Sequence, residues 1–156
     1  MNYEENYKYI RKIVEKVNKA GKVKIESDGI ENIPKEDGFV MFPNHQGLYD
    51  TLAFFESCPR ALSFVIKKEA SNIILLKQVV KATGSLVIDR ENIRQSMEVI
   101  TKMIEEVKKG RNFVIFPEGT RSKLGNKLLD FKPGSFKSAV KAKAPIVPCA
   151  IMNAYI

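Results

Sequence analysis

The sequence has few of the residues that would indicate a metal centre, a disulfide framework or a membrane-spanning segment. It contains one histidine and two cysteines, and no run approaching the roughly 18 apolar residues that a spanning helix needs. Cys58 and Cys149 are far apart and follow no ligand spacing, so we interpret them as free buried thiols in a reducing compartment. One histidine and scattered acids predict no metal site.

Acidic residues are also in deficit, with 18 Asp and Glu against 26 Lys and Arg and a formal charge of +8. This excess favours an anionic partner: nucleic acid, an anionic membrane surface or a phosphorylated substrate. Nucleic acid is disfavoured, because the phenylalanines lie mostly inside apolar strands rather than among the basic residues. The start of the chain lacks a signal-peptide hydrophobic region, so a protein acting at a membrane would lie on its surface.

The 156 residues suffice for one domain with its own core. Apolar periodicity predicts helices and strands in alternation. The expected helices cover residues 3–20, 49–57, 73–82, 92–109 and 135–143. The expected strands cover residues 23–26, 39–42, 63–66, 86–88, 113–116 and 146–147. The alternation predicts an α/β layered domain with a mostly parallel central sheet flanked by helices.

Two of the expected helices have a recognisable apolar face. In residues 3–20 the face is formed by Tyr3, Tyr7, Ile10, Val14 and Val17. Such a basic amphipathic helix either rests in a lipid headgroup layer or packs onto its own domain, and both can hold together. In residues 92–109 the expected face is formed by Ile93, Met97, Ile100, Ile104 and Val107.

The only histidine, His45, lies in the segment 44–50 with Asp50 five residues further on. Histidine is suited to general-base catalysis near neutral pH, and a carboxylate on its second ring nitrogen would fix the tautomer. Residues five apart on a helix point about 140° away from each other. The two side chains therefore meet only if His45 lies in a strand-to-helix turn, which Gly47 permits, and Asp50 lies in the first helical turn. The alternative is a surface histidine beside an unrelated aspartate.

A second cluster, residues 116–122, begins a long polar loop that extends to about residue 133, and long loops of this kind are often functional. His45, Arg90 and Arg121 each follow a predicted buried strand. Ligands of open α/β sheets gather at the carboxyl ends of the strands, so we expect these three residues to converge on one edge.

Four blocks of this sequence, in order, resemble the glycerophospholipid acyltransferase family, in particular its bacterial 1-acyl-sn-glycerol-3-phosphate acyltransferases. Residues 44–50 fit an NHxxxxD block, 84–90 a glycine-to-arginine block, 116–122 an FPEGTRS block and 144–148 a proline-containing strand block. Val87 stands where the family usually has an aromatic residue, and Pro43 replaces a commoner small polar residue. Residues 1–20 are then expected to form an amphipathic helix and residues 21–156 an acyltransferase catalytic domain that is truncated at its C-terminus.

The resemblance implies transfer of a fatty acyl group from acyl-CoA or acyl carrier protein to the free hydroxyl of 1-acyl-sn-glycerol-3-phosphate, giving phosphatidic acid. His45 would be the general base and Asp50 its orienting partner; the donor is a co-substrate, and no cofactor is implied. Another acceptor, such as glycerol 3-phosphate or a lysophospholipid, remains an alternative. So does a non-catalytic fragment that binds anionic lipid.

The same resemblance implies that Arg90 and Arg121 hold the acceptor phosphate, because a guanidinium can bond two phosphate oxygens at once. The other candidates for substrate binding are Asn44, Lys67, Glu118, Gly119 and Thr120. Glu118 would bond an acceptor hydroxyl or Arg121, and Lys67 is alternatively a solvated surface lysine. Backbone N–H groups of residues 44–47 are candidates for the oxyanion donors. We expect a peripheral enzyme on the cytoplasmic side of the membrane, with the lipid surface and the acyl carrier as partners.

Overall fold

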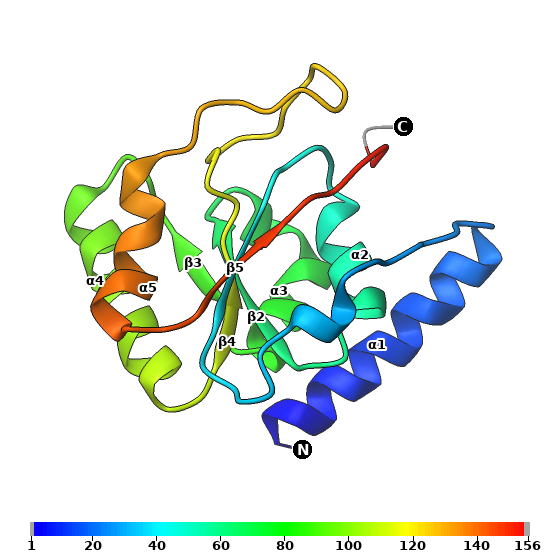
Figure 1. The fold of residues 1–156 in the computed structure, drawn as a ribbon, viewed down its shortest axis with the longest axis horizontal. Coiled ribbons are helices and arrows are strands. Elements are labelled where there is room, and N and C mark those ends of the chain that lie inside the picture. The colour runs from blue at the N-terminus through cyan, green and yellow to red at the C-terminus, as the bar shows by residue number, and fades with distance from the viewer. Residues whose placement is uncertain (1, 155–156) are drawn as a thin grey trace.

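A computed structural model describes residues 2–154, and in this range the chain forms one five-stranded parallel sheet of order β3-β2-β4-β1-β5 (Figure 1). The strands are β1 (Val40–Pro43), β2 (Leu62–Lys67), β3 (Leu86–Ile88), β4 (Asn112–Val114) and β5 (Ile146–Cys149). The α-helices are α1 (Tyr3–Ala20), α2 (Asp50–Ser57), α3 (Ile74–Ala82), α4 (Ile93–Lys108) and α5 (Lys137–Ala142). Short 3-10 turns cover Ile30–Asn32, Ala70–Asn72 and Pro133–Phe136.

The sheet is the middle of three layers, because successive strand residues face opposite sides. Phe39 and Met41 pack in one apolar cluster with residues of α1 and α2, while Val40 and Phe42 pack in a second cluster with residues of α4. In Figure 1 the helices α4 and α5 accordingly lie on one side of the sheet and α1, α2 and α3 on the other. All four residues of β1 are buried, which explains their continuous apolar character.

Helix α1 packs onto its own domain through the buried side chains of Tyr7, Ile10 and Val14. Its start is closed by a capping box, in which Asn2 and Glu5 each accept the other's backbone N–H at 2.9 Å. No helix in the described part of the chain is both long and apolar enough to cross a bilayer.

The predicted α/β layered domain is confirmed, with local differences. The strand predicted at 113–116 is β4, and the helix predicted at 135–143 begins as a 3-10 turn before α5. Residues 23–26 form no strand, because this alternating stretch has no neighbour in the sheet. Val17 on α1 is 53% exposed rather than buried with the rest of the predicted face. On α4 the buried face is Val99, Met103 and Val107, whereas the expected Ile93 and Met97 are exposed.

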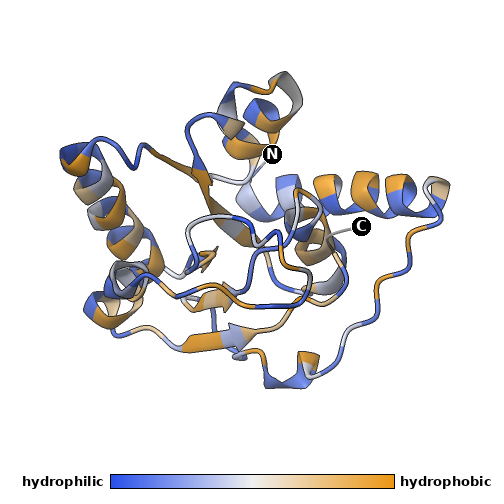
Figure 2. Cartoon of the chain, turned by 90° about the horizontal axis from the view of Figure 1, so that it is seen from above, coloured by the Kyte–Doolittle hydropathy of each residue, from blue (hydrophilic) through white to orange (hydrophobic). Residues whose placement is uncertain are grey.

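Because all strands run parallel, their carboxyl ends meet at one edge, and the segments that follow them gather there. Seen from above in Figure 2, these connecting loops cross over the sheet between the two helical layers. The strands beneath are coloured as hydrophobic, whereas the loops include many hydrophilic stretches. This edge holds the candidate site.

Candidate active site

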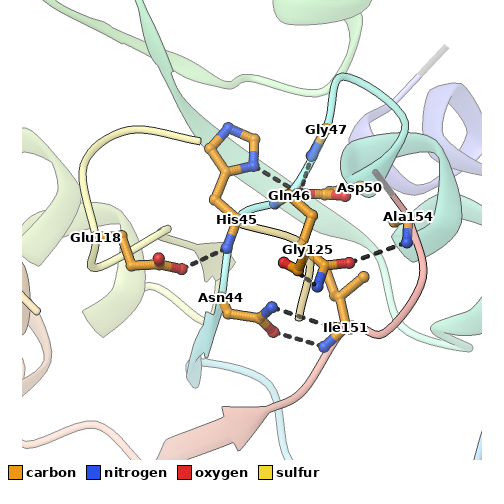
Figure 3. Close-up of polar contacts among 9 residues, drawn as sticks. All are labelled: Asn44, His45, Gln46, Gly47, Asp50, Glu118, Gly125, Ile151 and Ala154. Atoms are coloured by element: carbon orange, nitrogen blue, oxygen red, sulfur yellow. Dashed lines mark hydrogen bonds and ion pairs between the residues drawn. The ribbon is translucent and has the colours of Figure 1, made fainter. Parts of the chain in front are cut away.

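His45 and Asp50 form a direct contact at the carboxyl end of β1. His45 lies two residues beyond the strand and Asp50 is the first residue of α2, which is the strand-to-helix turn that the spacing requires. The Nδ1 atom of His45 lies 2.6 Å from Oδ2 of Asp50 (Figure 3). A carboxylate accepts, so Nδ1 is the donor in this contact and Nε2 is left outside it. The predicted pairing is confirmed in geometry.

The Asp50 carboxylate also shapes the turn that carries His45. It is fully buried, and its Oδ2 accepts backbone N–H bonds from Gln46 at 2.7 Å and from Gly47 at 3.1 Å. Its other oxygen, Oδ1, is buried without a hydrogen-bond partner among the described residues. One carboxylate oxygen thus fixes both the imidazole and the backbone on which it is mounted.

Two residues of the 116–122 block fix His45 from the other side. The ring of Phe116 stacks on the imidazole with 4.0 Å between centroids and an interplanar angle of 23°. Glu118, only 1% exposed, accepts the backbone N–H of His45 at 2.6 Å through Oε1 and that of Leu129 at 2.8 Å through Oε2. Phe116 lies in the recognised block, but its sequence position alone did not indicate that it contacts the histidine.

The backbone amides proposed as oxyanion donors have other acceptors. The N–H of His45 donates to Glu118, and those of Gln46 and Gly47 donate to Asp50. Three of the four amides in residues 44–47 are therefore occupied by buried carboxylates, and the expectation that they bind the oxyanion is not supported.

Gly47 is required by a close backbone approach rather than by an unusual torsion angle. A β-carbon at this position would lie 2.6 Å from the carbonyl oxygen of Ala154. Asn44 holds the same segment, because its side chain accepts the N–H of Ile151 at 2.6 Å and donates to that residue's oxygen at 2.9 Å. The chain after β5 thereby forms one wall of the site.

Arg90 and Arg121 lie on the same edge as His45, as predicted. The N–H of Ser122, directly after Arg121, donates to the His45 oxygen at 2.7 Å. Arg90 reaches the same loop from β3: its Nη1 lies 3.5 Å from where a β-carbon on Gly119 would stand, and Gly119 has a positive φ of 73°. Enclosure by neighbouring atoms lowers the pKa of the Arg90 guanidinium from its ordinary value, yet arginine stays charged in proteins.

The remaining candidates differ in how they are engaged. Thr120 is exposed at the start of the loop. Lys67, the last residue of β2, is exposed and pairs with Glu69 at 3.1 Å. Substrate binding by each of the candidate residues stays a prediction. The side chains of Asn44, Glu118 and Lys67 already have protein partners.

A surface hollow lies away from this edge, along the outer side of α4 near Ile93 and Met97. It contains no residue of the blocks described above, so the His45 edge remains the candidate site. Within residues 2–154 no three His, Cys, Asp or Glu side chains are grouped as metal ligands.

The chain is similar in sequence to known proteins across most of its length. A family model described as Acyltransferase matches residues 24–152. The chain is 32% identical over 131 residues to a 1-acyl-sn-glycerol-3-phosphate acyltransferase of Borreliella burgdorferi, covering 84% of this chain and 52% of that protein. It is 36% identical over 115 residues to the protein of the same name from Salmonella typhimurium, covering 73% and 46%.

A solved structure is also similar. The crystal structure of the 1-acyl-sn-glycerophosphate acyltransferase PlsC from Thermotoga maritima matches with a TM-score of 0.80 and 30% identity. The match covers 99% of this chain and 62% of that one. The chain spans about half the length of the curated relatives it matches.

Proposed function

The chain belongs to the acyltransferase family, and on this basis we propose that it transfers a fatty acyl group from an acyl thioester to the free hydroxyl of 1-acyl-sn-glycerol-3-phosphate. The product is phosphatidic acid and the by-product a free thiol. The observation that carries the proposal is the His45–Asp50 pair, whose second ring nitrogen remains available. The names of the relatives support the choice of acceptor.

His45 is the proposed general base. Nε2 has no hydrogen-bond partner among the described residues, and 21% of the side chain is exposed, so a substrate hydroxyl can reach it. An alcohol is a poor nucleophile until its proton is removed in the transition state, and a positioned base contributes typically about 10²–10⁴-fold. The buried carboxylate of Asp50 stabilises the imidazolium that forms.

In the proposed reaction the acceptor attacks the thioester directly, and no covalent enzyme intermediate is needed. The acceptor oxygen attacks the thioester carbon while Nε2 takes its proton, giving a tetrahedral oxyanion. The carbon–sulfur bond then breaks, the new ester remains, and the imidazolium returns the proton to the leaving thiolate. The proposed steps do not use Cys58 or Cys149: burial raises the pKa of both thiols, and a protonated thiol is a weak nucleophile. Cys58 is buried as predicted, whereas Cys149 is only partly buried.

Arg121 and Arg90 are the proposed ligands of the acceptor phosphate. Arg121 lies in the loop whose Ser122 N–H donates to the backbone oxygen of His45, and the Arg90 side chain lies near Gly119 of the same loop. A phosphate held there would place a neighbouring hydroxyl of the same small molecule near the imidazole, and such positioning lowers the entropic part of the barrier. The donor is acyl-CoA or acyl carrier protein; both carry the same thioester and a phosphate-bearing arm.

A substitution of Arg121 tests this assignment. Arg121→Ala is expected to raise KM for lysophosphatidate by at least about tenfold, since a charge-assisted bond contributes about 1.5–3 kcal/mol, with KM for the acyl donor little changed. Arg94→Ala is the matched control, because Arg94 is an almost fully exposed arginine on α4. Equal kinetic constants for Arg121→Ala and Arg94→Ala would remove Arg121 from the acceptor site.

The other acceptors stay in the comparison. Glycerol 3-phosphate and lysophospholipids with larger headgroups should be assayed with the same donors. Preference for lysophosphatidate supports the proposal. Preference for glycerol 3-phosphate would make that alcohol the acceptor of the same reaction. A folded protein with no turnover on any acceptor would favour a lipid-binding fragment. We place the protein peripherally at the cytoplasmic side of the membrane, where an acyl carrier and a lipid acceptor meet.

A further inference from the structure

An aromatic ring covers one face of the His45 imidazole. The ring belongs to Phe116, and the two rings stack with 4.0 Å between their centroids and an interplanar angle of 23°. His45 lies two residues beyond β1 and Phe116 two residues beyond β4, and these strands are parallel neighbours in the sheet. The imidazole therefore contacts two groups of different kinds: the Asp50 carboxylate at its Nδ1 edge (Figure 3) and a π face.

Backbone contacts hold the two stacked residues in place. Phe116 packs against the apolar cluster that includes residues of α1 and α2, and its backbone oxygen accepts the N–H of Gly119 at 3.1 Å. Glu118 accepts the backbone N–H of His45, and the N–H of Ser122 donates to the backbone oxygen of His45. The loop that carries Phe116 thus binds the peptide groups on both sides of His45, which fixes the backbone positions from which the two rings meet.

The stack has a consequence for the charge that the imidazole acquires during the proposed reaction. The face of a phenyl ring is the negative part of its quadrupole and attracts a cation within about 6 Å of the ring centroid. The imidazole is neutral before it takes the acceptor's proton and cationic afterwards. The attraction is therefore stronger in the transition state than in the ground state, and interactions of this kind raise kcat. Only 21% of the His45 side chain is exposed, so water screens the attraction less than at an open surface.

A second stack in the protein has a similar shape but contains no imidazole. The rings of Phe42 and Phe136 lie 4.5 Å apart between centroids with an interplanar angle of 31°, within the apolar cluster on the other side of the sheet. That pair can contribute only packing. It therefore separates the effect of ring shape, which both stacks share, from the effect of ring charge distribution on a cation.

We propose that Phe116 is a positioning residue for the general base, and that the face of its ring stabilises the imidazolium of His45 while holding the imidazole in its orientation. The inference rests on the proposed function for the reaction in which the imidazolium forms. The effect on the imidazolium itself requires no substrate, so it can be measured without turnover.

The sharpest test changes the charge distribution of the ring and keeps its shape. Phenylalanine at position 116 is replaced by analogues with one, three or five ring fluorines, which progressively weaken and then reverse the quadrupole. The analogues are introduced at a single codon, because the chain has nine phenylalanines. The matched control is the same series at Phe136. His45 is the only histidine, so its ring protons give one set of imidazole signals whose protonation can be followed by NMR.

We expect the midpoint of the His45 protonation curve to fall by at least about 0.4 of a pH unit with five fluorines at position 116, because the imidazolium loses its favourable contact. In acyl-transfer assays kcat should fall by about 2–30-fold, with KM for the acceptor little changed. The series at Phe136 should alter neither quantity. A midpoint that does not move with fluorination at position 116, or that moves equally with fluorination at position 136, would overturn the proposal. Unchanged kcat in an active protein would overturn it as well, because the ring would then not act on the transition state.

The stack itself is tested by Phe116→Leu, which keeps an apolar side chain of similar size and removes the π face. The ring current of Phe116 shields the stacked imidazole, so the His45 ring-proton signals should move to lower field in the folded variant. Coinciding signals in the two folded proteins would contradict the stack and overturn the proposal. Absence of acyl transfer by the unsubstituted protein would count against the proposed function alone, since the NMR measurements report on the imidazolium without substrate.

Discussion

The carboxylate of Glu118 accepts the backbone N–H of His45 at 2.6 Å, across 73 residues of sequence. The same carboxylate accepts the N–H of Leu129, so both oxygens serve the backbone. A buried carboxylate that satisfies two loops holds them at a fixed separation. The Glu118 carboxylate therefore holds the FPEGTRS loop and the histidine turn together. These contacts set the backbone position of Arg121 relative to His45.

Substitution of Glu118 should damage both folding and activity. Glu118→Gln places an amide NH₂ against one backbone N–H and leaves that donor unsatisfied, a loss of about 1–3 kcal/mol in the free energy of unfolding. Thermal or denaturant unfolding measures the loss. Glu36→Gln removes an exposed carboxylate and should change stability little. Equal stability of the two variants would show that the Glu118 contacts do not stabilise the turn.

Asp50→Asn should lower kcat by about 10²–10⁴-fold, the usual range for loss of general-base function. The neutral amide cannot stabilise an imidazolium as a carboxylate does. Its NH₂ group must also lie either against the N–H groups of Gln46 and Gly47, or at the place of Oδ1, which has no hydrogen-bond partner among the described residues. Steady-state kinetics of a folded variant checks the prediction. Asp28→Asn, which changes an exposed aspartate, is the control. Similar kcat in both variants would contradict the role of Asp50.

Gly47→Ala should disturb the site by steric overlap alone. The new β-carbon would lie 2.6 Å from the Ala154 oxygen, so the histidine turn or the chain after β5 has to move. We expect a lower melting temperature and reduced kcat. Gly134→Ala is the matched control, since no neighbouring atom lies within 4 Å of the place its β-carbon would take and the change should cost little. Equal melting temperatures of the two variants would contradict the close approach of Gly47 to the backbone of Ala154.

The two thiols should react slowly in the native protein. Burial raises the pKa of Cys149 to about 11, so roughly one molecule in 1000 carries its thiolate at pH 8. Burial also raises the pKa of Cys58, whose side chain lies in the core. Labelling with a chromogenic disulfide at pH 8 should be slow until guanidinium exposes both thiols. Acyl transfer should survive alkylating reagents, and rapid loss of activity on alkylation of the folded protein would contradict a mechanism without a cysteine.

Local rules were sufficient for much of the fold and for the central contact of the site. The expected helix over residues 3–20 has the observed bounds of α1, and the continuous apolar runs before His45 and after residue 112 predicted the buried strands of a parallel sheet. The five-residue spacing of His45 and Asp50 predicted a strand-to-helix turn, because on one continuous helix the two side chains would point away from each other. The structure contains that turn.

Contacts between distant segments could not be predicted in this way. Nothing in the local pattern indicates that Glu118 binds a backbone amide or that Gly47 abuts Ala154, because both depend on three-dimensional packing. The predicted face of α4 was wrong in part, at Ile93 and Met97, for a different reason. The apolar residues of α4 form one broad face that is wider than the part packed on the sheet, so periodicity alone did not distinguish the buried Val99 and Met103 from the exposed Met97.

The decisive experiment on the proposed mechanism is transfer of a labelled acyl group to lysophosphatidate, from acyl-CoA and from acyl carrier protein, by the unsubstituted protein and by His45→Ala. We expect clear activity in the first and a loss of at least about 10²-fold in the second. Equal activity in the two proteins would contradict the assignment of His45 as the base.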